Sequence, residues 1–295
     1  MSAADRTGLR PASVAFAALL LAPLAFTATS VAGGAQSWRT LTASRQARGA
    51  DSLRVRVEYG VGTLRVTKGT PSLLYEANLR YDEEKFDPVR SFDDATHTFT
   101  VGAHQRSSGS TLAAGRKNFG NLALSLAPGV PLDLTLDLGA TRSVVDLSEL
   151  SVRRLRIGAG ASETKLTFGA PNPLAMEELS VQAGAASIVI VGLGNAHAER
   201  VRVKCNAGSV DLDLGGAWAA NMELQLDIGV GAATLRLPRE VGVRIRLDKV
   251  LATFERGGLL ERDGSYYSGN WESATRKLTI DASTTLGALE VRWIE

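Results

Sequence analysis

Most of the chain alternates between apolar and polar residues with a period of two, which predicts strands with one buried face. The clearest stretch is 201–214, in which Val201, Val203 and Cys205 precede a small-residue turn, and Leu212 and Leu214 follow it. No segment after residue 50 keeps an apolar period of 3.6 residues over three turns, as an amphipathic helix would require. The pattern therefore predicts an all-β protein.

The alternating unit repeats along the chain. Copies can be anchored in their small-residue turns at Gly62, Thr141, Gly160, Gly184, Gly208, Gly231, Val250 and Ser283; from 141 to 250 the spacings are 19, 24, 24, 23 and 19 residues. The copy at Gly160 begins its second strand two residues late. So short a unit cannot bury its own apolar face, so the copies must stack.

We therefore predict a single-chain parallel β-solenoid (β-helix) with coils of about 19–24 residues. Neighbouring coils would lie about 4.8 Å apart, with aliphatic ladders inside. Glycine tolerates tight bends, so we expect structural corners at Gly62, Gly160, Gly184, Gly208 and Gly231.

The repeat also predicts the domain organisation. Residues 36–51 are polar without steady periodicity and indicate a linker, and 52–295 form the solenoid domain. Within it, 52–130 would form an N-terminal β-rich cap and the first coil, because an open coil end leaves an unpaired sheet edge. Residues 131–295 would form the repeated coils, with a loop insertion at 255–273 before the final one.

Residues 1–35 have the pattern of a secretory signal peptide. Two arginines precede an apolar run of 13 residues from Val14 to Phe26, and small residues follow it. A spanning helix needs roughly 20 apolar residues, so this run is short. We predict an exported protein, periplasmic or extracellular, and the alternative is a membrane anchor formed by residues 12–32.

Composition excludes more chemistry than it suggests. The 33 Lys and Arg residues nearly balance the 31 Asp and Glu residues, for a net charge of +2, so we expect no nucleic-acid partner. Three histidines and one cysteine argue against a metal cluster. The sequence contains neither a Walker motif, nor a complete Gly-x-Gly-x-x-Gly, nor a Gly-x-Ser-x-Gly elbow. We therefore predict no enzyme activity, no cofactor and no metal.

Two groups of residues are weak candidates for binding. Asp211 and Asp213 share the outer face of one strand and could hold a cation or act on a glycan, or they could simply be solvated. Tyr266, Tyr267 and Trp271 could stack on sugars or anchor a partner, or they could be a flap packed on the last coil. Cys205 stands at an inward position and should behave as a buried, inert hydrophobe.

Several segments carry a family resemblance: VEYGVGTLRV at 57–66, LDLGA at 136–140, LGNAHAERV at 193–201 and LPREVGV at 237–243. They are similar to the C-terminal domain of LiaF-like cell-envelope stress proteins, a β-helical module also described as toastrack or adhesin-like. The resemblance implies a role at the bacterial envelope, in stress sensing or surface binding, and brings no catalytic residues. LiaF-type proteins carry several membrane helices before this domain, whereas this chain has only the signal-like segment, so direct regulation of a membrane kinase does not follow.

Together these observations predict a non-catalytic extracytoplasmic module that binds or senses a cell-envelope component or an envelope protein, as an accessory to envelope stress response. Two alternatives stay open. One is a glycan-active β-helical enzyme using outward-facing carboxylates, and the other is a structural, self-associating surface module.

Overall fold

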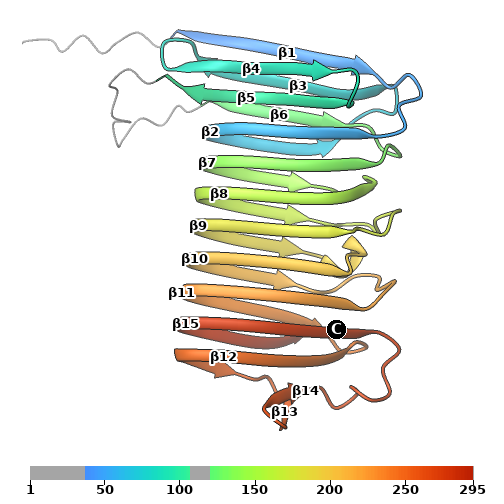
Figure 1. The fold of residues 1–295 in the computed structure, drawn as a ribbon, viewed down its shortest axis with the longest axis vertical. Helices are drawn as coiled ribbons and strands as arrows, with labels where there is room; N and C mark the ends of the chain where they lie inside the picture. The colour runs from blue at the N-terminus through green and yellow to red at the C-terminus, as the bar shows by residue number, and fades with distance from the viewer. Residues whose placement is uncertain (1–36, 107–119, 295) are drawn as a thin grey trace, which may run out of the picture. The chain divides into compact units, whose positions relative to one another are not determined.

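A computed structural model describes residues 37–106 and 120–294, which form a tall stack of bent strands (Figure 1). The predicted signal peptide lies outside the described residues. Eight long strands bend at their middle, so that one half lies on the front of the stack and the other half behind it (Figure 1). They are β2 (Leu53–Lys68), β7 (Leu132–Asp146), β8 (Val152–Thr167), β9 (Glu178–Val191), β10 (Arg200–Asp213), β11 (Met222–Pro238), β12 (Gly242–Glu255) and β15 (Lys277–Ile294).

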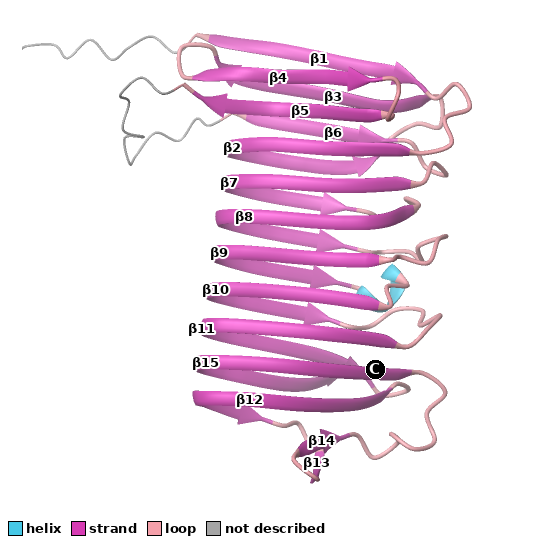
Figure 2. Ribbon diagram, in the orientation of Figure 1, coloured by secondary structure: helices cyan, strands magenta, loops and turns pink. Residues whose placement is uncertain are grey.

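Neighbouring long strands are parallel and in register, which confirms the predicted β-solenoid. Inward residues form ladders through the stack: one runs through Leu136, Ile157, Val181, Val203 and Leu226, all buried. Burying each such side chain stabilises the fold by roughly 1.5–3 kcal/mol. The only helical element among the described residues is a 3-10 turn, η1 (Leu193–Ala196) (Figure 2).

The alternation of inward and outward residues changes phase at each corner. In β11 the buried residues are Leu224, Leu226 and Ile228 before the bend, and Ala233 and Leu235 after it. Four successive positions, 229–232, lie between the last buried residue of one phase and the first buried residue of the next. The bend is tight enough to require glycine at one of these positions.

That glycine is Gly231, which has a φ of 146° and whose missing Cβ would lie 1.8 Å from the carbonyl oxygen of Gly208. Gly62 and Gly208 have the same left-handed backbone. Gly160 and Gly184 also lie at corners, but two positions earlier in register, because Ser162 and Ala186 are the residues aligned with Gly208. Because Gly160 lies two positions before the residue aligned with Gly208, its second strand begins two residues later when counted from this anchor.

At the N-terminal end the sheet divides into two branches, one from each half of β2. β5 (Thr98–Gln105) pairs with the first half of β2, and β4 (Phe86–Asp93) pairs with β5. β6 (Asn121–Leu126) pairs with the second half of β2, followed outward by β3 (Leu73–Asp82) and β1 (Trp38–Gln46). The linker predicted at 36–51 is therefore wrong for residues 38–46, which form β1. Its inward positions include only Leu41 and the buried Ala43, too few apolar residues to reveal a strand.

The last coil in the sequence is not the last coil in space. β15 lies between β11 and β12 and is parallel to both, so β12 ends the stack (Figures 1 and 2). The predicted insertion contains a small hairpin, β13 (Leu260–Arg262) and β14 (Ser265–Tyr267), which pairs with β12 at Arg244 and Ile245. In the described part of the chain, no helix has the length and apolarity needed to cross a membrane.

We expect Gly231→Ala to lower the free energy of unfolding by several kcal/mol, because the added Cβ would overlap the carbonyl of Gly208 at a left-handed backbone position. Urea denaturation followed by circular dichroism measures the change. Gly158→Ala is the matched control, since its Cβ would meet only the Asp137 side chain at 3.6 Å. Equal stability of the two variants would contradict this account of the corner.

Candidate functional site

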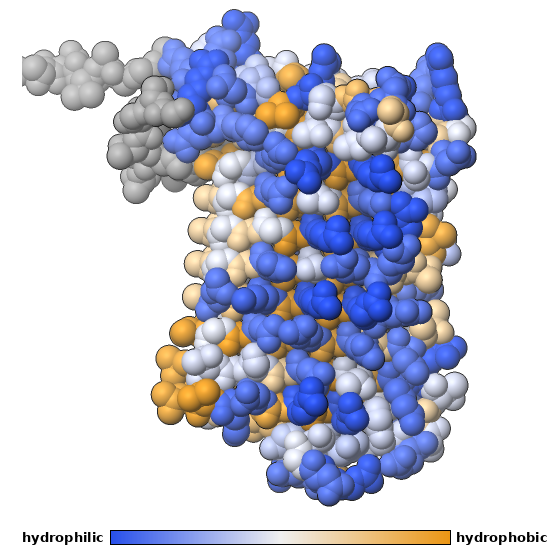
Figure 3. All heavy atoms as spheres, in the orientation of Figure 1, coloured by the Kyte–Doolittle hydropathy of each residue, from blue (hydrophilic) through white to orange (hydrophobic). Residues whose placement is uncertain are grey.

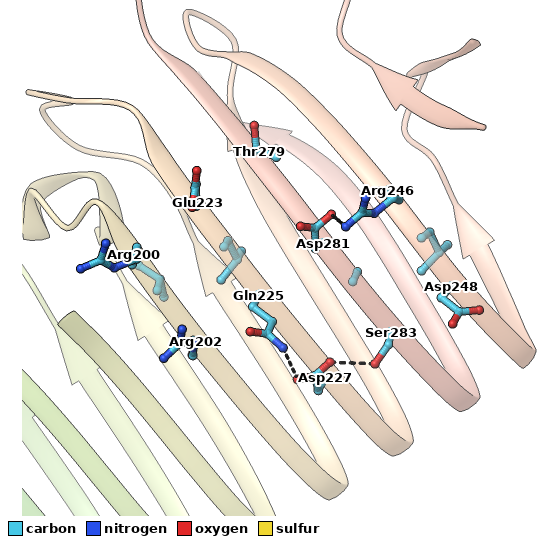
Figure 4. Close-up of a pocket in the computed structure, with 14 residues that line it drawn as sticks. Arg200, Arg202, Glu223, Gln225, Asp227, Arg246, Asp248, Thr279, Asp281 and Ser283 are labelled. Carbon is cyan, nitrogen blue, oxygen red and sulfur yellow. Dashed lines mark hydrogen bonds and ion pairs between the residues drawn. The ribbon is translucent and has the colours of Figure 1, made fainter. Parts of the chain in front are cut away.

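A groove crosses the front of the stack where the first halves of β10, β11, β15 and β12 lie side by side (Figure 4). It has a volume of about 700 Å³ and opens on a face dominated by polar side chains (Figure 3). Strand alternation aims every second side chain into it, so the groove is lined by repeated rows rather than by one loop.

The parallel register aligns the groove-facing side chains in three rows. One row contains Arg200, Glu223 and Thr279; the next contains Arg202, Gln225, Asp281 and Arg246; the third contains Asp227, Ser283 and Asp248. On β15 these positions hold the short side chains of Thr279, Asp281 and Ser283. In each row a longer side chain lies on at least one of the neighbouring strands, β11 or β12, so β15 forms the floor of a trough.

Hydrogen bonds fix part of the groove. The Ser283 hydroxyl donates to Asp227 at 2.8 Å, and the Gln225 amide donates to the same carboxylate at 3.1 Å (Figure 4). Arg246 forms an ion pair with Asp281 at 2.9 Å. Such exposed pairs add little stability, typically about 0–1 kcal/mol.

Other charged groups in the groove have no ionic partner. Arg200 and Arg202 on β10 form no ion pair with any residue that the structure describes, and the same holds for Glu223 and Asp248. The groove thus offers two guanidinium groups on β10, and the carboxylates of Glu223 on β11 and Asp248 on β12, that form no ion pair with a described residue. It can accept a polar ligand that carries both signs of charge.

The structure places the predicted carboxylates elsewhere, on the second half of β10. Asp211 forms an ion pair with Arg236 at 2.6 Å, and Asp213 accepts a hydrogen bond from the backbone N–H of Gly215 at 2.8 Å. Both carboxylates are therefore engaged within the fold. Over the described residues, no group of three or more His, Cys, Asp or Glu side chains is arranged to hold a metal ion.

The predicted aromatic group packs on the end of the stack. Tyr266 meets Phe254 edge to face with ring centroids 4.8 Å apart, and Tyr267 meets Trp271 in the same way at 5.7 Å. The Arg262 guanidinium lies 4.4 Å from the centre of the Tyr267 ring. All three predicted rings are half-buried, an arrangement that favours the flap over a recognition site.

Cys205 is fully buried in an inward ladder between Ala183 and Ile228. Burial raises the pKa of its thiol, which keeps the thiolate, the reactive form, scarce.

Sequence reasoning did not find the groove. The groove-lining residues are visible in the sequence as charged and polar outward positions at 200–202, 223–227, 246–248 and 279–283. They form one site because β15 lies between β11 and β12, which the sequence does not predict.

The family model that matches the chain is that of the N-terminal domain of toast_rack, DUF2154, over residues 33–191 and 172–236, together more than half of the sequence. Among curated proteins, none matches.

Solved structures of bacterial proteins are also similar. A candidate cell adhesion protein from Clostridium sporogenes ATCC 15579 is 17% identical, with 88% of this chain and 100% of that chain covered and a TM-score of 0.46. A candidate adhesin from Bacteroides fragilis NCTC 9343 is 11% identical, with 86% and 97% covered and a TM-score of 0.35. A candidate lipid binding protein from Parabacteroides distasonis ATCC 8503 is 9% identical, with 88% and 97% covered and a TM-score of 0.34.

We expect the Cys205 thiol to resist modification by iodoacetamide in the folded protein and to react in urea, because it is enclosed by its ladder. Mass spectrometry after timed exposure reads the result. Rapid labelling of the native protein would show that this part of the core opens.

Replacing Tyr266, Tyr267 and Trp271 with alanine should lower Tm by several degrees, since it removes two edge-to-face pairs, each worth about 0.5–1.5 kcal/mol beyond burial. Binding to envelope material per folded molecule should not change. Tyr266→Phe with Tyr267→Phe keeps the rings and serves as the control. Loss of binding with unchanged Tm would instead assign these residues to recognition.

Proposed function

The chain belongs to the family of the N-terminal domain of toast_rack, and from this premise we propose that it is a non-catalytic extracytoplasmic module that binds a polar component of the cell envelope. The observation that carries the proposal is the groove over β10, β11, β15 and β12, with its rows of hydrogen-bonding side chains. Export rests on the signal-like pattern of residues 1–35, and fractionation of cells tests it.

The chemistry of the groove indicates the class of ligand. Arg200 and Arg202 suit a carboxylate or another anion, which guanidinium groups bind through paired hydrogen bonds. Glu223 and Asp248 suit an ammonium group, and Gln225, Thr279 and Ser283 suit hydroxyl and amide groups. No aromatic side chain lines the groove in the residues described, so the ligand would be held by polar contacts and not by stacking. Peptidoglycan, with amino sugars and short peptides of both charges, has all of these groups.

Binding to purified peptidoglycan tests the proposal by co-sedimentation. We expect the double variant Arg200→Ala, Arg202→Ala to bind at least about tenfold more weakly, since each charge-assisted hydrogen bond contributes roughly 1.5–3 kcal/mol. Added salt should weaken binding of the native protein as well.

The matched control is Arg65→Ala, which removes an exposed arginine from the second half of β2, far from the groove. Unchanged binding in the double variant, or equal loss in the control, would contradict the assignment of the groove. Release of soluble fragments that stops on replacing Asp211 or Asp213, or Asp227 or Asp281 in the groove, would favour the glycan-active enzyme.

A more specific role, as an accessory to envelope stress response, rests on the resemblance to LiaF-like proteins alone. An envelope protein that presents the same charges could occupy the groove in place of the polymer. Crosslinking in cells, with the Arg200→Ala, Arg202→Ala variant as the comparison, distinguishes these ligands.

A further inference from the structure

The C-terminal end of the stack exposes an unpaired strand edge. β12 pairs with β15 along one side, but on the other side β14 pairs only with Arg244 and Ile245. From Arg246 to Glu255, no described residue pairs with this edge. An open edge is a template for another strand, and proteins usually shield it.

The same stretch carries the most exposed large apolar side chains of the described residues. Val250 is 71% exposed and Leu251 is 72% exposed. Leu251 continues a row through Leu286 and Val230, where earlier coils have Ala207 and Ala185. The row appears as an apolar patch at the lower left of Figure 3, where β11, β15 and β12 bend. Contiguous apolar surface of this kind marks a site that another molecule covers.

The free edge is symmetric about its own centre, which lies between Val250 and Leu251. Leu247 and Phe254 are equally far from this centre, and both stand in inward rows, aligned with the buried Ala282 and Leu289. Arg246 and Glu255 are the next pair outward. The phase change at the corner makes this symmetry possible, because it gives both halves of the strand the same order of inward and outward residues.

We propose that two copies of this protein associate tail to tail, with their β12 edges paired antiparallel about a two-fold axis between Val250 and Leu251. In this register Leu247 faces Phe254 of the second copy, and Arg246 faces its Glu255. Each contact occurs twice, as in any isologous interface. The interface depends on main-chain hydrogen bonds, with side-chain pairs setting the register.

Charge selects this register over its neighbour. Moving the axis one residue toward the C-terminus would place Asp248 against Glu255, a like-charge pair directly across the strands, which is destabilising. In the proposed register Asp248 faces Thr253 and Lys249 faces Ala252. The second copy is therefore a better occupant than an arbitrary strand, since this edge complements itself.

The ends of the free stretch fit the same arrangement. Beyond Arg246 the edge is occupied by β14, and after Glu255 the chain turns away at Gly257 and Gly258, both with positive φ. One copy's strand thus ends where the other copy's hairpin begins. The hairpin also stops further growth along the edge, so the assembly closes at two copies.

Sedimentation velocity of the full chain over a range of concentrations tests the proposal, and we expect a monomer–dimer equilibrium. Glu255→Arg alone and Arg246→Glu alone should each weaken the dimer at least about tenfold, because every dimer then contains two like-charge pairs. An equimolar mixture of the two variants should restore it, since both contacts become Arg–Glu pairs again. Leu251→Asp should weaken the dimer without affecting folding, because the side chain is exposed.

The matched control is Glu76→Arg, which reverses an exposed charge on β3 at the other end of the stack and should leave the dimer intact. A native protein that stays monomeric to about 100 μM, far above the Kd expected of a specific dimer, would overturn the proposal. A dimer that survives Leu251→Asp, or one that the mixed variants fail to restore, would overturn it equally. None of these outcomes decides whether the groove binds its ligand, because that test measures peptidoglycan binding by the Arg200→Ala, Arg202→Ala variant, which leaves β12 unchanged.

Discussion

The in-register pairing of parallel coils is the constraint on which the rest of the structure depends. Because side chains alternate along a strand, a slip of one residue would turn an inward ladder toward solvent. The Val203 and Leu226 ladder therefore fixes the position of every outward side chain on β10 and β11. The same pairing brings successive corners so close that Gly231 lies against the carbonyl of Gly208.

The alternation of apolar and polar residues predicted those features of the fold that depend on local sequence. The solenoid and its toast_rack relationship are confirmed, because Val201, Val203 and Cys205 and their equivalents form a period of two that recurs with the coil length. β1 was missed because Ala43 is its only buried residue. Gly160 and Gly184 lie at corners as well, but two positions earlier in register than Gly208, and composition cannot distinguish the two rows because glycine occupies both.

The position of β15 could not be predicted, because nothing local tells residues 277–294 which neighbours they will have. This placement creates both surfaces on which the functional proposals rest. It brings Asp281 beside Arg246 and lays a strip of short side chains along the groove. It also leaves β12 at the end of the stack, with Val250 and Leu251 exposed.

A late strand inserted between two earlier ones also changes how the chain can fold. During synthesis β12 is complete before β15 exists. In the finished structure β12 pairs with β15 and not with β11. β12 must wait for the last 18-residue strand, or pair prematurely with β11 and be displaced. Contacts that await distant segments slow folding. A chain truncated before β15 therefore lacks an inner layer of the stack, and β12 has no β15 to pair with. The last strand in the sequence is thus required for the native end of the stack to form.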